Sequence, residues 1–302
     1  MGIYKFYGEF LRSDLFKNVL TNRLPYDVEG VSIDMNGTIH GVASKVYGYA
    51  TDRKGNNLLS EQELRILKSL IPEVMEGKLM VSLGERIINM IENNKFKKYI
   101  ILCVDGRCSV AKMRQQRDRR YLADKNLKSD IFNTNSISPG TLLMQKIDLY
   151  LKNWISQNRE ILPKTVIYSS HLVTGEGETK IFKLFRDNKI DQGNGYHMIV
   201  GLDADLVMLS SLSNFSKIML IRDNYRDIVD IDNYKKELVS LLTQKFPKNS
   251  DLVLQDFVVM IYLLGNDFIP HNMSLSNVGG VVPIMIEMYN SIEHSLTDEN
   301  YN

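Results

Sequence analysis

Short apolar runs alternate with amphipathic segments along most of this 302-residue chain. Runs rich in β-branched residues predict buried strands, because a strand that is covered on both faces carries apolar side chains at consecutive positions. Such runs occur at Gly30–Ile33, Tyr99–Val104, Thr165–Tyr168, His197–Leu202 and Lys217–Ile221. Helical patterns separate them, and this alternation is typical of a mostly parallel central sheet flanked by helices. We therefore expect an α/β fold.

Two of the intervening segments show helical spacing clearly. Leu79, Leu83 and Ile87 recur every four residues, and residues 141–161 carry a similar apolar stripe. Both stripes are expected to pack in the core rather than to contact a cofactor. The segment Gly41–Asn57 combines glycines, charges and weak periodicity, which predicts an irregular loop or a short hairpin.

Acidic residues follow most of the apolar runs, at the points where the predicted strands end. In a parallel sheet that edge is where ligands bind. Clustering many carboxylates there is unfavourable unless cations neutralise them, because like charges raise one another's pKa. Oxygen-only ligation favours Mg²⁺, with Mn²⁺ as an alternative. The candidate metal ligands are Asp34, Asp105, Glu176, Glu178, Asp203, Asp205 and Asp267. The competing interpretation is that each acid caps a helix or a turn, which is plausible for Asp203 taken singly.

Basic residues concentrate in one stretch of an otherwise balanced chain. The protein has 37 Lys and Arg against 36 Asp and Glu, so affinity for nucleic acid would require local segregation of charge. Six basic residues and the single acid Asp118 lie between Arg107 and Arg120. If Val110–Leu127 is helical, four side chains fall within an arc of about 100° and could bind a terminal phosphate: Lys112, Gln116, Arg119 and Arg120. Arg114 and Arg117 project elsewhere, and a solvated charged helix is the alternative.

The remaining composition limits the class of protein. Cys103 and Cys108 give neither a disulfide framework nor four metal ligands, so reduced thiols are expected. No long apolar run follows the N-terminus, and Phe6 stands where a myristoylation signal needs Ser or Thr. We expect a globular intracellular protein without a membrane segment, in the cytoplasm or, alternatively, the nucleus.

Eight sequence blocks appear in one order along nearly the whole chain. They are M-G-I-x-K-F at 1–6, D-M-N-G-T-I-H at 34–40, V-D-G at 104–106, A-K-M-R-Q-Q-R-D-R-R-Y at 111–121, S-P-G-T at 138–141, T-G-E-G-E-T-K at 174–180, G-L-D-A-D-L at 201–206 and L-L-G-N-D-F-I-P-H at 263–271. Together they resemble the XRN family of 5′-to-3′ exoribonucleases. The resemblance implies one nuclease domain of the XRN N-terminal type over residues 1–302, with a core like those of PIN domains and flap endonucleases. It also implies two Mg²⁺ ions and RNA degradation from a 5′-monophosphorylated single-stranded end, releasing nucleoside 5′-monophosphates.

The same resemblance assigns roles to the candidate residues. One ion would be held by Asp34, Asp105, Glu176 and Glu178, and the other by Asp203, Asp205 and Asp267. The basic face of Lys112, Gln116, Arg119 and Arg120 would bind the 5′-phosphate. His40 would stack on the terminal base, and Lys180 would lie near the scissile phosphate. From the residues alone, His40 could equally be structural, and Lys180 could be a solvated partner of Glu176.

The sequence also departs from the family pattern. Tyr4 stands where proline is usual, and the second conserved region that walls the active site is not among these 302 residues. We therefore expect a distributive enzyme, or a separate protein partner that replaces this wall. Two other functions stay open: a DNA-directed or structure-specific 5′ nuclease of the same superfamily, and a module that only binds RNA 5′ ends.

Overall fold

The computed structural model describes residues 6–297 except 17, 53, 95, 97, 126–131, 223–226, 267–268, 271, 273–274 and 276–277. Its strands are β1 (Leu20–Thr21), β2 (Val28–Asp34), β3 (Tyr99–Cys103), β4 (Thr165–Ser169), β5 (Tyr196–Val200), β6 (Ile218–Arg222) and β7 (Asp227–Asp230). Its helices are η1 (Phe6–Leu11), η2 (Asp14–Phe16), α1 (Met35–Val46), α2 (Glu61–Lys68), α3 (Pro72–Asn94), α4 (Val110–Lys125), η3 (Thr134–Ser136), α5 (Leu142–Gln157), α6 (Gly177–Arg186), α7 (Asp205–Ser211), α8 (Ile231–Leu242), α9 (Ser250–Tyr262) and α10 (Val278–Asn290).

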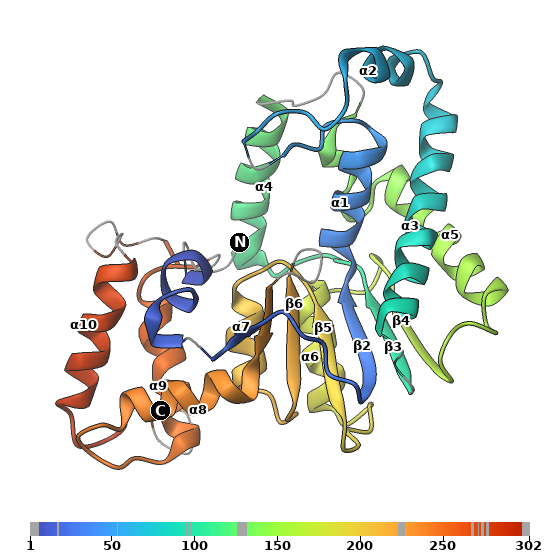
Figure 1. The fold of residues 1–302 in the computed structure, drawn as a ribbon. Helices are drawn as coiled ribbons and strands as arrows, with labels where there is room; N and C mark the ends of the chain where they lie inside the picture. The colour runs from blue at the N-terminus through green and yellow to red at the C-terminus, as the bar shows by residue number, and fades with distance from the viewer. Residues whose placement is uncertain are drawn as a thin grey trace. The chain divides into compact units, whose positions relative to one another are not determined.

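Within the described residues, seven strands form one mixed sheet in the order β1-β7-β6-β5-β2-β3-β4 (Figure 1). Strand β3 pairs in parallel with both β2 and β4, and β5 pairs in parallel with β6. Strand β7 pairs antiparallel with β6 and β1. The expected α/β fold is confirmed, and each of the five predicted apolar runs overlaps a strand. The sequence pattern missed β1 and β7, because strands of two and four residues are too short to show a period.

The chain divides into two compact units: a central unit, Gly30–Ile181, and a terminal unit, Met1–Glu29 with Phe182–Asn302. The chain passes from one unit to the other within β2 and again within α6. Both crossings therefore lie inside regular elements. The expectation of a single nuclease domain stays a prediction.

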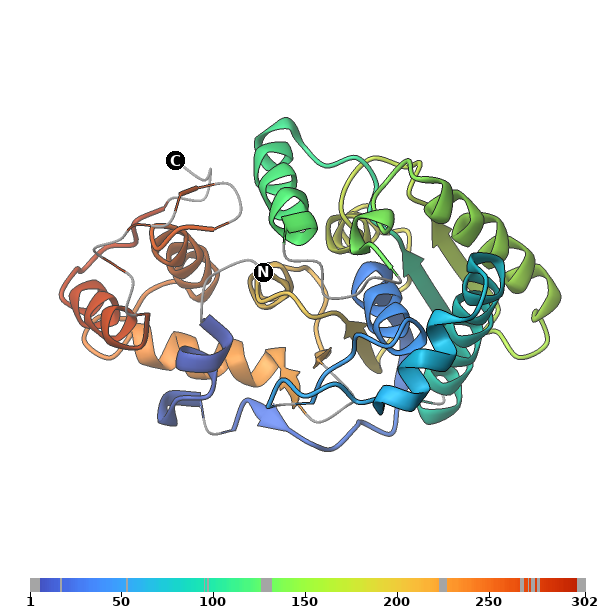
Figure 2. The same cartoon turned by 90° about the horizontal axis from the view of Figure 1, so that it is seen from above.

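The central unit packs helices around β2 and β3, whereas the edge strand β4 is partly exposed. Every residue of β2 and β3 is buried. Gly30 is required here, because a Cβ at this position would lie 2.4 Å from the Tyr99 ring. Helix α1 begins directly after β2 and packs against α3, and α3 and α5 lie side by side (Figure 2).

One expectation for this unit was wrong in part. The segment Gly41–Asn57 was expected to be irregular, but α1 continues to Val46 because Ile39, Val42 and Ala43 pack into the core at helical spacing. Further along, Thr51 and Asn57 form an isolated antiparallel bridge, which agrees with the predicted hairpin.

The terminal unit is built around a chain of aromatic rings. Phe10 contacts Phe6, Phe16 and Phe257 with ring-centroid distances of 5.1, 4.8 and 5.7 Å, and Phe16 contacts Tyr234 at 5.4 Å. These five rings tie η1 and η2 to α8 and α9, so Phe6, Phe10 and Phe16 are part of the core of this unit. Such buried rings contribute large apolar areas to stability.

Candidate metal and nucleic-acid site

The strand register of the central unit brings several site candidates to one edge. Asp34, the last residue of β2, lies opposite Cys103, and Cys103 lies opposite Ser169. The residues that follow β3 and β4 therefore emerge next to Asp34, as expected for the carboxyl ends of parallel strands. Asp34 also caps α1, since its carboxylate accepts a hydrogen bond from the Asn36 N–H. The capping alternative and the ligand role are thus compatible for this residue.

Asp105 is held in place by two neighbours from distant parts of the sequence. Asn36 Nδ2 donates to Asp105 Oδ2 at 2.9 Å, and the Asp105 N–H donates back to Asn36 Oδ1 at 3.1 Å. The Gly177 N–H, at the start of α6, donates to Asp105 Oδ1 at 2.6 Å. A helix N-terminus favours a carboxylate there because its N–H groups carry partial positive charge. The side chain of Asp105 is therefore held in one orientation by donors from α1 and α6.

Gly177 is a site residue that the sequence analysis did not single out. A Cβ at this position would lie 2.5 Å from Asp34 Oδ1 and 2.9 Å from the Cys103 carbonyl. Only glycine lets α6 begin this close to both Asp34 and Asp105. The signal was present as the second glycine of G-E-G-E.

Lys180 lies between the ends of β3 and β4. Its Nζ donates to the Val104 carbonyl at 2.7 Å and to the Ser170 carbonyl at 3.0 Å, and the side chain is buried. Burial lowers the pKa of Lys180, although the charge of Asp105 acts in the opposite direction. The alternative of a solvated partner of Glu176 is therefore wrong. The geometry makes Lys180 a positioning residue for the segment that carries Asp105.

An ion pair joins the acidic edge to the basic helix. Lys112 Nζ lies 2.5 Å from Glu176 Oε1, and the two side chains are only 4% and 15% exposed. Two backbone hydrogen bonds join the same two segments. The Gly106 N–H donates to the Gly175 carbonyl, and the Gly175 N–H donates to the Arg107 carbonyl, both at 2.9 Å. Gly175 has a φ of 103°, a backbone conformation that glycine adopts without strain. The segment before α4 is thus tied by backbone and side chains to the segment before α6.

The predicted basic helix is confirmed from Val110 to Lys125, while the last two residues of its expected range lie outside the described residues. On its predicted phosphate face Lys112 is buried, Gln116 is half-buried, and Arg119 and Arg120 are exposed. The alternative of a purely solvated charged helix does not explain why Lys112 is buried.

His40 lies on the exposed side of α1. The pKa of His40 is lowered first by desolvation and then by the positive charge of Arg119. Arg119 is therefore near enough to His40 to act on its charge.

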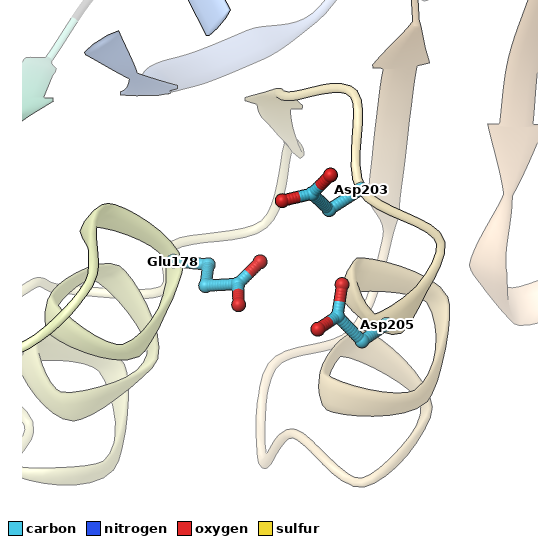
Figure 3. A group of neighbouring side chains, drawn as sticks. All are labelled: Glu178, Asp203 and Asp205. Atoms are coloured by element: carbon cyan, nitrogen blue, oxygen red, sulfur yellow. The ribbon is translucent and has the colours of Figure 1, made fainter. Parts of the chain in front are cut away.

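Among the described residues, Glu178, Asp203 and Asp205 form the one group of acids whose oxygens lie close enough to hold a metal ion, and Asp34, Asp105 and Glu176 are not part of it (Figure 3). Asp203 precedes α7, Asp205 is its first residue, and Glu178 lies in the first turn of α6. Each side chain offers one carboxylate oxygen, and these oxygens lie within 4.8 Å of one another.

The family resemblance placed Glu178 with Asp34, Asp105 and Glu176, whereas the geometry groups it with Asp203 and Asp205. The ion that it serves stays a prediction. Asp267 lies outside the described residues. The donor set is entirely carboxylate oxygen, which is the ligand chemistry of Mg²⁺ and Mn²⁺ rather than of Zn²⁺.

The fold is similar to that of a solved nuclease. The catalytic core of Rad2 in complex with DNA substrate superimposes with a TM-score of 0.50, covering 94% of this chain and 68% of that chain at 16% sequence identity. At this identity the likeness defines the class of fold alone, an α/β core shared with the Rad2 nuclease. In the described part of the chain, no helix combines the length and apolar character needed to cross a membrane.

The family model for the XRN 5′-3′ exonuclease N-terminus matches residues 1–130 and 123–224. The chain therefore belongs to the XRN 5′-3′ exonuclease family. It is 27% identical to 5′-3′ exoribonuclease 1 of Schizosaccharomyces pombe and 25% identical to that of Homo sapiens, in each case over 97% of this chain. It is 26% identical to 5′-3′ exoribonuclease 2 of Candida glabrata over 73% of this chain. The matched regions span 24%, 19% and 28% of these relatives' lengths.

Proposed function

We propose that this chain is a Mg²⁺-dependent 5′-to-3′ exoribonuclease that hydrolyses 5′-monophosphorylated single-stranded RNA to nucleoside 5′-monophosphates. The observation that carries the proposal is the Lys112–Glu176 ion pair. It links a cluster of carboxylates, which suits metal ions, to a helix face with arginines, which suits a phosphate. A nuclease that cuts from a phosphorylated end needs both parts at a fixed distance.

The carboxylates at the strand ends would hold the ions. By family resemblance, Asp34, Asp105 and Glu176 would supply one set of oxygens and Asp203, Asp205 and Asp267 the other, while Glu178 lies close to Asp203 and Asp205. When bound, two such ions stabilise the attacking hydroxide and the leaving oxygen of a phosphodiester. The hydrogen bonds from Asn36 and Gly177 orient Asp105 in advance, so little reorganisation is needed on binding.

The basic face selects the end of the RNA. Arg119 and Arg120 offer fork-shaped donors that match a terminal phosphate, and Gln116 offers an amide donor. Lys112 adds its charge while holding Glu176 in place. His40 offers a flat neutral ring on which the first base can stack. Lys180 fixes the ends of β3 and β4 and so the position of Asp105.

A digestion time course tests this function. The substrates are one RNA sequence with a 5′-monophosphate, a 5′-triphosphate or a 5′-hydroxyl, and the same sequence as 5′-monophosphate DNA, each with Mg²⁺ or with EDTA. We expect mononucleotides from the 5′-monophosphate RNA with Mg²⁺ alone. Preferred digestion of DNA indicates the DNA-directed alternative, and tight binding of RNA ends without cleavage indicates the end-binding module. Cleavage that persists in EDTA contradicts the metal assignment.

The phosphate face can be tested separately with Arg120→Ala. This variant should slow the degradation of 5′-monophosphate RNA by about tenfold or more, because one charge-assisted phosphate contact is lost. Residual cleavage of 5′-hydroxyl RNA should change far less. Arg159→Ala, an exposed arginine after α5, is the matched control and should leave both rates unchanged. An equal loss on both RNA ends in Arg120→Ala contradicts the role in end selection.

A further inference from the structure

Helix α4 carries a second set of side chains that the proposed phosphate site does not use. At 100° per residue these side chains fall within an arc of about 80°, roughly 150° around the helix from the phosphate face. We call this set the outer face, and it consists of Val110, Arg114, Arg117, Tyr121 and Lys125.

The outer face is open to solvent. Val110 is 81% exposed and Tyr121 is 68% exposed, and Arg114, Arg117 and Lys125 are exposed as well. Among the described residues, neither Arg114 nor Arg117 forms an ion pair. In both ribbon views α4 stands apart from α3 and α5 of the same unit (Figure 1, Figure 2). The buried, paired Lys112 on the other side of the helix shows how different the two faces are.

Positive charge is concentrated on this helix. Helix α4 has six basic and two acidic side chains, whereas the whole chain has a net charge of only +1. The two acids, Asp118 and Asp124, flank the outer face rather than lie within it, and Asp124 accepts a hydrogen bond from Asn133 Nδ2. Two arginines and a lysine around an exposed tyrosine therefore form a locally cationic surface.

We infer that the outer face of α4 binds single-stranded nucleic acid through backbone phosphates and one base, away from the 5′ end. Arginine forks match phosphate oxygens, and an exposed tyrosine ring offers a stacking platform for any base. A membrane surface would need a broad apolar face, but Val110 is the single aliphatic residue of this set. Binding here requires neither a metal ion nor a 5′-phosphate, so the inference goes beyond the proposed function.

The test measures binding without hydrolysis. A 3′-labelled RNA oligonucleotide with a 5′-hydroxyl is titrated in EDTA at several salt concentrations, using fluorescence anisotropy. Losing two phosphate contacts should reduce the slope of log K against log salt by about 1.4, since each contact contributes about 0.7 for single strands. We therefore expect this reduction for the double variant Arg114→Ala/Arg117→Ala. Alanine favours helices, so α4 should stay folded, and circular dichroism checks this.

Two controls separate specific binding from general charge effects. Arg65→Ala/Arg159→Ala removes two exposed arginines of the same unit outside α4, and its slope should equal that of the wild type. Tyr121→Ala should weaken binding about fivefold or more without changing the slope, while Tyr121→Phe keeps the ring and the affinity.

The inference is overturned if the slope of Arg114→Ala/Arg117→Ala equals that of the wild type, or if the control pair shows the same reduction. It is also overturned if Tyr121→Ala binds as well as the wild type, or if polyglutamate loses as much affinity for Arg114→Ala/Arg117→Ala as RNA does. The last result would indicate a surface for acidic proteins. Because these measurements use EDTA, their failure leaves the proposed hydrolysis untouched.

Discussion

Asp105 in the central unit and Asp256 in the terminal unit are both held by hydrogen bonds, but in different surroundings. Asp256 is 0% exposed and accepts four hydrogen bonds, from the Tyr289 hydroxyl, the Leu296 N–H, and the N–H and hydroxyl of Thr297. These donors match the roughly four lone-pair sites of a carboxylate. Asp105 is half-buried at the strand ends, close to other acids.

The difference separates a structural carboxylate from one arranged for a ligand. Asp256 anchors the segment after α10 to α9, and its burial is offset by a complete set of donors. Burial, and then the hydrogen bond to Asp256, raise the pKa of Tyr289, so this hydroxyl stays a donor at any physiological pH. Carboxylates that lie as close together as Glu178, Asp203 and Asp205 repel one another, which lowers stability unless a cation binds.

The largest expected effect is on catalysis. Asp203→Ala and Asp205→Ala should each slow Mg²⁺-dependent cleavage by on the order of 10³-fold, because metal stabilisation of the transition state is worth several kcal/mol. Without metal, the melting temperature should be unchanged or slightly higher, since a repulsive charge is removed. Activity assays are combined with thermal melts with and without Mg²⁺. If the wild type gains no stability from Mg²⁺ or Mn²⁺, or a variant cleaves at the wild-type rate, these residues do not bind the metal.

For Asp256 we expect a loss of stability rather than a direct loss of catalysis. Asp256→Ala should lower the free energy of unfolding by about 4 kcal/mol, because several buried donors lose their partner. Asp105→Ala is the matched variant and should lower it by less than about 1 kcal/mol, since water can reach its partners. Urea unfolding measures both. Equal losses would remove the distinction between the two carboxylates.

Variants of the Lys112–Glu176 pair test separately what the pair contributes to stability and what it contributes to cleavage. Lys112→Met should destabilise the protein by about 2 kcal/mol, because Glu176 is left as a half-buried charge without this partner. The double variant Lys112→Met/Glu176→Gln should regain most of that loss, because no charge remains to be buried. Its cleavage activity should stay low. A double variant as unstable as the single one would show that the pair is not the main interaction of Glu176.

The smallest expected effect concerns pH. His171 is buried and its Nδ1 accepts the Gly140 N–H, so the ring is neutral. Burial lowers the pKa of His171, an effect opposed by Asp148 and supported by Lys152 and Lys180. Below about pH 6.5 the unfolded chain then binds a proton that the folded chain does not, so stability falls by up to about 1.4 kcal/mol per pH unit.

His171→Gln keeps an acceptor for Gly140 but does not titrate. Urea unfolding between pH 7 and 5 should therefore show a shallower loss of stability for this variant than for the wild type. Identical slopes for the two proteins would mean that His171 is protonated equally in the folded and unfolded states.

The sequence by itself determined the fold class, five strands and the places where acids follow them. These features are local, because an apolar run predicts a buried strand and a following acid marks its end. The same holds for the basic helix from Val110, whose charge and spacing are visible in sixteen consecutive residues. The short strands β1 and β7 carry too few residues for such a pattern, and the extension of α1 to Val46 depends on packing against α3.

Only the tertiary structure decided which of these residues meet. Asn36 and Asp105 are 69 positions apart in the sequence. Lys112 and Glu176 are also far apart in the sequence, yet they form an ion pair. Their meeting depends on strand register and on how close α6 can approach, which the small size of Gly177 permits. The burial and pairing of Lys112 on a helix whose other basic side chains are exposed also follows from packing, since both faces have similar charge in the sequence. Local patterns fix which residue types are available, whereas long-range contacts fix their neighbours, and it is the neighbours that determine the chemistry.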